Sequence, residues 1–191
     1  MPPMPETEEV QQGIIRGAYC CQPRSGKGLA VDLLASGALM QQAIEASAIL
    51  QDLGYAPAIW SVTSYIELAR QAEACERAAR LSPLEEAEAS YLHKMFGALD
   101  GPIIAVSDYQ KSLSGSIARW MPKTYTVLGT DGFGVSGSRP ELRDHFEVSV
   151  KHIVQAALVA FHRQGDIDEE TLKRQLAPLG IEKGKADPAG R

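Results

Sequence analysis

The residues with the clearest spacing for chemistry are the glycines of the segment Tyr125 to His145, YTVLGTDGFGVSGSRPELRDH. Gly132, Gly134 and Gly137 match the G-x-G-x-x-G spacing of a dinucleotide-binding turn, between a β-branched run and a helix signal. In a true fingerprint, a second parallel strand carries an acidic residue about 20 residues further on. The corresponding region here is an apolar helical pattern. The spacing is therefore only a weak indication of nucleotide binding.

The same loop also suits the presentation of backbone to another surface. Its glycines permit positive φ or a close approach. Ser138 is a candidate N-cap, with Glu141 three residues later and Pro140 in the first helical turn. Two interpretations stay open, an ordinary strand-to-helix loop and a loop that contacts a partner domain. The candidate contact residues are Gly129, Thr130, Asp131, Gly132, Phe133 and Gly134.

Asp108 and Tyr109 form a second candidate site. They follow the apolar run PIIAV at residues 102–106, which predicts a buried strand. The carboxyl end of a strand is where open α/β sheets hold functional groups. A cap on the helix expected from about residue 112 is an equally good interpretation of Asp108.

Other constellations of reactive residues are incomplete. The turn RSGKG at residues 24–28 resembles a phosphate loop, but Lys27 is not followed by Ser or Thr. The four histidines include no pair four residues apart and no companion Cys or Asp at metal-ligand spacing, so zinc is not indicated. No serine lies in a GxSxG elbow. We expect no catalytic, cofactor-binding or metal-binding residue in this chain.

Composition is that of an ordinary globular domain. The 191 residues are 45% hydrophobic and 23% charged, which predicts one domain. A net charge of −5 without a basic block disfavours nucleic acid and anionic membranes, and no apolar run is long enough to span a bilayer. The three cysteines have no paired spacing, and Cys20 and Cys21 would point to opposite faces of a strand. We expect reduced, mostly buried cysteines and a cytoplasmic location.

Hydrophobic periodicity predicts strands that alternate with helices. Strands are expected at residues 18–21, 29–35, 58–62, 102–106 and 125–128. Helices are expected at residues 8–17, 38–53, 65–81, 83–99 with one break, 112–121, 148–163 and 168–179. On the first helix, Val10, Ile14 and Ile15 should face inward, and Thr63 or Ser64 should cap the third. The alternation predicts an α/β sandwich with a largely parallel sheet and an antiparallel first strand at one edge.

The domain organisation follows from the ends of the chain. Residues 1–17 are expected to be a linker or arm, since they open with the Pro-rich MPPMPE. Residues 18–180 form the folded domain. Residues 181–191 are expected to be a disordered tail.

Collinear motifs along nearly the whole chain resemble one known family. They are GIIRGAY (13–19), LLASGAL (33–39), WSVTSYIELAR (60–70), CER (75–77), SDYQK (107–111), VLGTDGFG (127–134) and SRPELRDHFEV (138–148). The chain resembles the C-terminal domain of the homodimeric, thiamine-diphosphate-dependent pyruvate dehydrogenase, the decarboxylating component of the pyruvate dehydrogenase complex. This resemblance implies a three-layer α/β/α sandwich with a mostly parallel five-stranded sheet, as in the transketolase C-terminal domain.

The resemblance also implies a function for the full assembly, which oxidatively decarboxylates pyruvate and transfers acetyl to a lipoyl carrier. Thiamine diphosphate and Mg²⁺ would lie between pyrophosphate- and pyrimidine-binding domains, in segments absent here. The chain alone is expected to be inactive and to support the dimer, with the loop at residues 129–134 as a contact. Implied partners are those two domains, in the same or a separate chain, a second copy of the enzyme, and dihydrolipoamide acetyltransferase.

The chain departs from the family at several positions. Val135 and Gly137 replace the Arg and Asp of the usual GFGRSDSR, and Ala78-Ala79 replaces a Trp-Asn pair. These changes indicate altered interdomain contacts and keep open a non-catalytic interaction or regulatory subunit descended from that domain. Because MPPMPE matches an internal linker, an excised domain, a truncated gene and a split subunit are all open. A stand-alone nucleotide-binding protein rests only on the glycine spacing.

Overall fold

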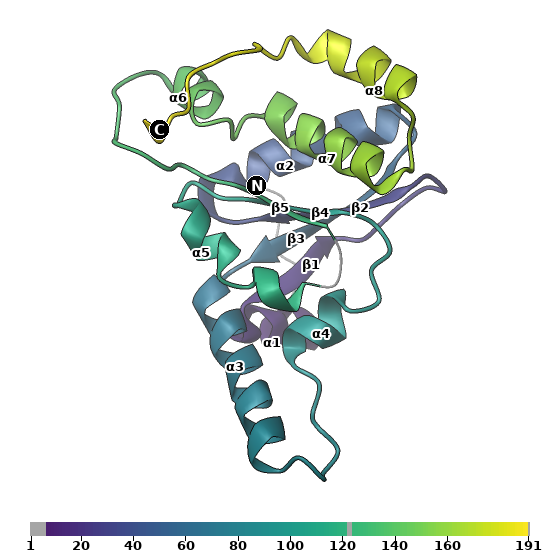
Figure 1. Ribbon diagram of the computed structural model, residues 1–191, viewed down its shortest axis with the longest axis vertical. Helices are drawn as coiled ribbons and strands as arrows, with labels where there is room; N and C mark the ends of the chain where they lie inside the picture. Colours follow the sequence, from purple (N-terminus) through teal and green to yellow (C-terminus); the bar gives the residue numbers. More distant parts are fainter. Residues whose placement is uncertain (1–6, 122–123, 191) are drawn as a thin grey trace.

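A five-stranded sheet forms the centre of the molecule in the computed structural model, which describes residues 7–121 and 124–190 (Figure 1). The strands are β1 (Ala18–Gln22), β2 (Ala30–Ala35), β3 (Ala56–Val62), β4 (Ile103–Val106) and β5 (Tyr125–Leu128). Their order across the sheet is β1-β3-β2-β4-β5. The strand β1 runs antiparallel to β3, and the other three pairs are parallel. The predicted α/β class and the antiparallel edge strand are both confirmed.

The central strands are buried on both faces, as expected of a parallel sheet with helices on each side, and apart from Asp32 of β2 their buried side chains are apolar. In β2, Leu33 and Ala35 face one hydrophobic core and Leu34 faces the other. The register places Leu33 between Ile59 of β3 and Ile104 of β4, and all three are fully buried. Alternation along each strand therefore supplies two separate cores.

One face of the sheet is covered by α2 (Met40–Asp52) and α7 (Val150–Gln164), with α8 (Glu169–Leu176) outside them (Figure 1). The short helix α6 (Arg139–His145) leads into α7 on the same side. A stacked pair, Tyr55 and Phe161 with ring centroids 4.7 Å apart, closes this core. The helix α7 ends at Gly165, whose φ of 85° suits only glycine well.

The opposite face is covered by α1 (Glu8–Arg16), α3 (Tyr65–Leu81), α4 (Tyr91–Phe96) and α5 (Lys111–Gly115) (Figure 1). Trp60 of β3 meets Phe96 of α4 edge to face at 5.0 Å. The hydroxyl of Ser64 accepts a hydrogen bond from the backbone N–H of Glu67 at 3.1 Å, which makes Ser64 the cap of α3. The three layers are therefore those that the sequence predicts.

The prediction of a helix over residues 83–99 is wrong for the first half of that stretch, because no helix precedes α4 there. Leu84 is fully exposed, so the segment has no apolar stripe to bury against the sheet. Three glutamates, Glu85, Glu86 and Glu88, also place like charges together. Helix-forming residue types are not sufficient here, because most of the stability of a helix in a protein comes from packing.

Two smaller expectations are also wrong. Ile15 of α1 is 70% exposed rather than buried, whereas Val10 is 7% exposed. The helix expected over residues 112–121 is split into α5 and a 3₁₀ turn, η2 (Ala118–Trp120). The hydroxyl of Ser116 donates to the carbonyl of Leu113 at 2.6 Å, and such a bond competes with helical pairing.

The ends of the chain are only partly described. Residues 1–6 of the predicted arm lie outside the described residues, and residues 8–16 form α1. After the 3₁₀ turn η3 (Ala177–Leu179), the described chain contains no further helix or strand. The disorder of residues 181–191 stays a prediction. None of the described helices combines the length and hydropathy that crossing a membrane requires.

Candidate contact surface at the carboxyl edge of the sheet

The inner half of the loop after β5 is anchored to the loop after β4. The backbone N–H of Thr130 donates to the carbonyl of Tyr109 at 2.9 Å, and its hydroxyl donates to the carbonyl of Asp108 at 2.8 Å. The carboxylate of Asp131 accepts from the backbone N–H of Lys111 at 2.9 Å. Gly129 is buried in this junction, where a Cβ would stand 2.7 Å from the Tyr109 carbonyl oxygen. The anchoring needs glycine at this position.

The outer half of the same loop is open to solvent. The side chain of Phe133 is 93% exposed and that of Val135 is 47% exposed. Gly132 has a φ of 103°, which turns the chain at a position that L side chains rarely adopt. Glu141 accepts hydrogen bonds from the backbone and hydroxyl of Ser138 at 2.8 and 2.7 Å, which fixes the start of α6. An exposed phenylalanine is therefore held between two ordered anchors.

Asp108 and Tyr109 both follow β4, but they line different hollows. Asp108 lies beside Gly37, where a Cβ would stand 2.8 Å from its Oδ1 atom, on the side that carries α2. Tyr109 is 59% exposed and lines a groove of about 750 Å³ on the side that carries α3 and α5. These neighbours in sequence therefore do not share one site.

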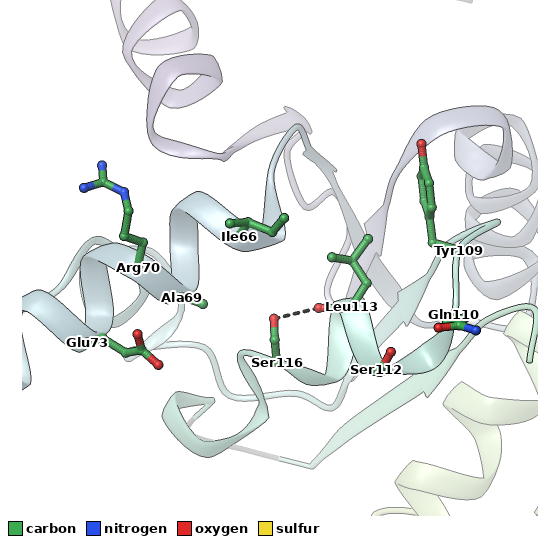
Figure 2. A pocket seen from close by; sticks show the side chains of 9 residues that line it. All are labelled: Ile66, Ala69, Arg70, Glu73, Tyr109, Gln110, Ser112, Leu113 and Ser116. Atoms are coloured by element: carbon green, nitrogen blue, oxygen red, sulfur yellow. Dashed lines mark hydrogen bonds between the residues drawn. The ribbon is translucent and has the colours of Figure 1, made fainter.

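Figure 2 shows this groove, with Ile66, Arg70 and Glu73 projecting from α3 and Leu113 from α5. Ile66 is 69% exposed, so the floor is apolar. The guanidinium of Arg70 forms an ion pair with Glu67 at 2.5 Å rather than turning toward the groove. The groove offers apolar contact and no constellation of reactive groups.

A second pocket of about 810 Å³ lies between α2, α6 and the loop after β5. Its apolar lining comes from Leu39, Leu142, Phe146 and Val148. Its polar lining comes from Gln41, Asp108, Thr130, Arg139 and Arg143. Sequence reasoning missed the two arginines, although their i,i+4 spacing in SRPELR puts them on one helix face.

The ionisable groups in the interior have structural roles. Asp32 is fully buried and accepts hydrogen bonds from Arg24 at 2.7 Å and Trp60 Nε1 at 2.9 Å. Burial raises the pKa of Asp32 above its ordinary value, against the effect of these two donors. Cys20 and Cys21 pack on opposite faces of the sheet, as predicted. Burial raises the pKa of Cys20 to about 11, so its thiol is protonated and unreactive at neutral pH.

The contact between Ser149 and His152 resembles part of a catalytic dyad but has a local cause. The Ser149 hydroxyl lies 2.8 Å from His152 Nδ1, at the first turn of α7. Burial lowers the pKa of His152, so the ring is neutral at pH 7. Asp144, whose charge acts on the pKa of this ring, instead pairs with Lys151 at 2.5 Å. Within residues 7–121 and 124–190, no three His, Cys, Asp or Glu side chains are grouped to hold a metal ion.

Comparison with known proteins connects this architecture to a family. The model of the transketolase-like TK C-terminal domain matches residues 17–149. The chain is 40% identical over 190 residues to the pyruvate dehydrogenase E1 component of Pseudomonas aeruginosa, covering 98% of this chain and 21% of that protein. The Escherichia coli K12 protein of the same name is 39% identical over the same shares. The chain thus spans about a fifth of the length of the curated relatives that it matches.

Solved structures show the same fold at lower sequence identity. Transketolase from Pichia stipitis, in complex with sedoheptulose-7-phosphate, aligns with a TM-score of 0.56 and 18% identity, over 86% of this chain and 21% of that one. Transketolase from Campylobacter jejuni aligns with a TM-score of 0.52 and 22% identity, over 75% and 18%.

The chain is therefore an α/β domain that belongs to the transketolase-like C-terminal domain family. Among the members of that family, it is similar to the pyruvate dehydrogenase E1 component along almost its whole length. The expected resemblance is confirmed.

Proposed function

We propose that this chain is the C-terminal, dimer-supporting domain of a pyruvate dehydrogenase. In the full assembly, other domains oxidatively decarboxylate pyruvate and transfer acetyl to a lipoyl carrier. The observation that carries the proposal is the 40% identity to a pyruvate dehydrogenase E1 component over 98% of this chain. Because the match takes up only 21% of that relative, the remainder must supply most of the enzyme.

The carboxyl edge of the sheet supports a contact role. Phe133 is held in the open by a loop whose base is tied to Tyr109 and Lys111. An exposed aromatic side chain on a rigid base is typical of an interface anchor, since little entropy is lost when it becomes buried. Residues 129–134 are the proposed contacts with the pyrimidine-binding domain and with a second copy of the enzyme.

The cofactors of the full assembly would be thiamine diphosphate and Mg²⁺. Magnesium prefers oxygen ligands, usually carboxylates together with substrate phosphates. The described residues contain no cluster of acidic side chains that fits this role. The proposal therefore assigns this chain contacts and support, and it assigns the chemistry to the pyrophosphate- and pyrimidine-binding domains. The assembly would work in the cytoplasm with dihydrolipoamide acetyltransferase as its partner.

A calorimetric titration tests this division of labour. The 191-residue chain is titrated with thiamine diphosphate in the presence of Mg²⁺, and no saturable heat is expected. The chain is then mixed with a separately expressed fragment that carries the other two domains, and stable association is expected. Tight cofactor binding by this chain alone, or no association with that fragment, would overturn the proposal.

A second candidate is a non-catalytic interaction or regulatory subunit derived from the same domain. It is favoured by the exposure of three of the departures from the family pattern, at Ala78, Val135 and Gly137. Substitutions at the surface change partners more readily than they change the fold. The two candidates differ in one measurement, because only an integral domain restores pyruvate decarboxylation when it is combined with the other two domains.

A further inference from the structure

The pocket of about 810 Å³ lies at a switch point of the sheet. After β2 the chain turns to α2 on one face, and after β4 it turns to α5 on the other. The strands β2 and β4 are parallel neighbours, so a crevice opens between their diverging loops. In open α/β sheets, ligands bind in such a crevice outside the carboxyl ends of the strands.

The two positive charges of this pocket lie together on α6, and the carboxylate among its lining residues is that of Asp108. Arg139 and Arg143 are four residues apart on α6, and both line it. Among the described residues, neither forms an ion pair, and Arg143 reaches only the carbonyl of Ala38 at 3.5 Å. Like charges at i,i+4 destabilise a helix, so the pair gains stability from a bound anion.

The acidic side chains of the same helix are already engaged. Glu141 accepts from Ser138, and Asp144 pairs with Lys151 and Lys185. They do not neutralise the arginines. Guanidinium groups bind phosphate and carboxylate in a two-bonded geometry, which makes such groups the best match for this end of the pocket.

The rest of the pocket is suited to an apolar body. Leu39 and Val148 are each 2% exposed, and the half-buried Leu142 and Phe146 complete the wall. Asp108 and Thr130, which also line the pocket, offer oxygen acceptors for a hydroxyl or amine. A mostly apolar hollow of this volume with a few convergent polar groups is typical of a small-molecule site.

We propose that this pocket binds a small organic anion, which carries one phosphate or carboxylate group on an apolar body. The anionic group lies between Arg139 and Arg143, and the body lies against Leu142 and Phe146. The proposal goes beyond the contact role assigned above, and the two share Thr130, Gly132 and Gly134, which line the pocket from the contact loop. A pocket filled by a side chain of a neighbouring domain is the competing arrangement.

The test uses the 191-residue chain and four probes. Phenyl phosphate and phenylacetate combine an anion with an apolar ring, inorganic phosphate has only the charge, and benzyl alcohol has only the ring. Binding is measured by titration of amide nuclear magnetic resonance signals. We expect saturable shifts with one or both ring-bearing anions, centred on Thr130 and Phe146. Whether phenyl phosphate or phenylacetate binds more tightly shows whether the pocket prefers a phosphate or a carboxylate.

Three variants localise the binding. Arg139→Gln removes an exposed side chain that takes part in no hydrogen bond of the described residues, so folding is retained. The double variant with Arg143→Gln should weaken binding by about tenfold or more. Arg77→Gln, an exposed arginine on α3 across the sheet, is the matched control and should leave affinity unchanged.

Three results would overturn the proposal. One is the absence of saturable shifts with either ring-bearing anion. Another is inorganic phosphate binding as tightly as phenyl phosphate, which would mean that only surface charge is recognised. The third is equal weakening by Arg77→Gln and by the α6 variants. The urea unfolding midpoint of each variant is compared with that of the parent chain, to show that the variant is folded.

Discussion

The carboxylate of Asp131 accepts a hydrogen bond from the backbone N–H of Lys111, 20 residues earlier in the chain, at 2.9 Å. Lys111 is the first residue of α5, and Gln110, at the cap position, supplies no side-chain hydrogen bond. The loop after β5 therefore caps the helix after β4. Phe133 is only two residues from this bond, so its position depends on it.

Asp131→Ala should lower the free energy of unfolding by about 1–2 kcal/mol, because an amide at a helix start loses its acceptor. Asp131→Asn keeps a side-chain oxygen and should cost less. Urea unfolding of both variants and the parent chain measures the difference. Equal stability of Asp131→Ala and the parent chain would contradict the capping role.

Gly129→Ala should destabilise the junction between the same two loops. A Cβ at this position would stand 2.7 Å from the Tyr109 carbonyl oxygen and 2.9 Å from the Lys111 nitrogen. Overpacking against backbone costs about 1–3 kcal/mol. Gly134→Ala is the matched control, since nothing lies within 4 Å of its Cβ, and it should change stability by about 0.5 kcal/mol or less. Thermal unfolding compares the two, and similar melting temperatures would refute the prediction.

Sequence pattern was sufficient for the fold because the sheet is buried on both faces. Runs such as Ile103–Val106 have no polar residue that could face solvent, so the strand assignment has little competition. The helix prediction for the Glu-rich stretch before α4 failed because that stretch is not buried. Its residues prefer helix locally, but Leu84 finds nothing to pack against, and only the tertiary structure reveals that.

The candidate site was predictable as a region but not in its geometry. The glycines and Asp131 mark the loop in the sequence, whereas their partners Tyr109 and Lys111 come from the loop after β4 and from the first residue of α5. Asp108 and Tyr109 are adjacent in sequence, yet they line different hollows. Contacts between loops depend on which strands are neighbours, and local patterns do not contain that information.

Asp32→Asn should change how stability depends on pH. Burial raises the pKa of Asp32 in the folded chain, while the unfolded chain ionises it near the ordinary value of 3.8. As pH rises from that value through the folded pKa, the unfolded state loses its proton first, so the folded state of the parent chain loses stability. The asparagine variant lacks this titration. Urea unfolding from acid to neutral pH should therefore show that the free energy of unfolding of the variant rises relative to that of the parent chain as pH rises.

Asp32→Ala is the informative companion to that variant. It leaves Trp60 Nε1 and Arg24 without the acceptor that each has at 2.9 and 2.7 Å. An unpaired buried donor costs about 1–3 kcal/mol, so the alanine variant should be less stable than the asparagine variant at every pH. A flat difference between Asp32→Asn and the parent chain across the whole range would contradict the raised pKa.

Phe133→Ser should separate folding from assembly. The side chain is 93% exposed, so the isolated chain should unfold within about 0.5 kcal/mol of the parent. If Phe133 is an interface anchor, association with a fragment that carries the other two domains should weaken by about tenfold or more. Leu84→Ser is the matched control, because Leu84 is fully exposed in the segment between α3 and α4, far in sequence from the loop after β5. Association is measured by analytical ultracentrifugation. If both substitutions weaken it equally, or if neither weakens it, Phe133 is not part of the contact surface.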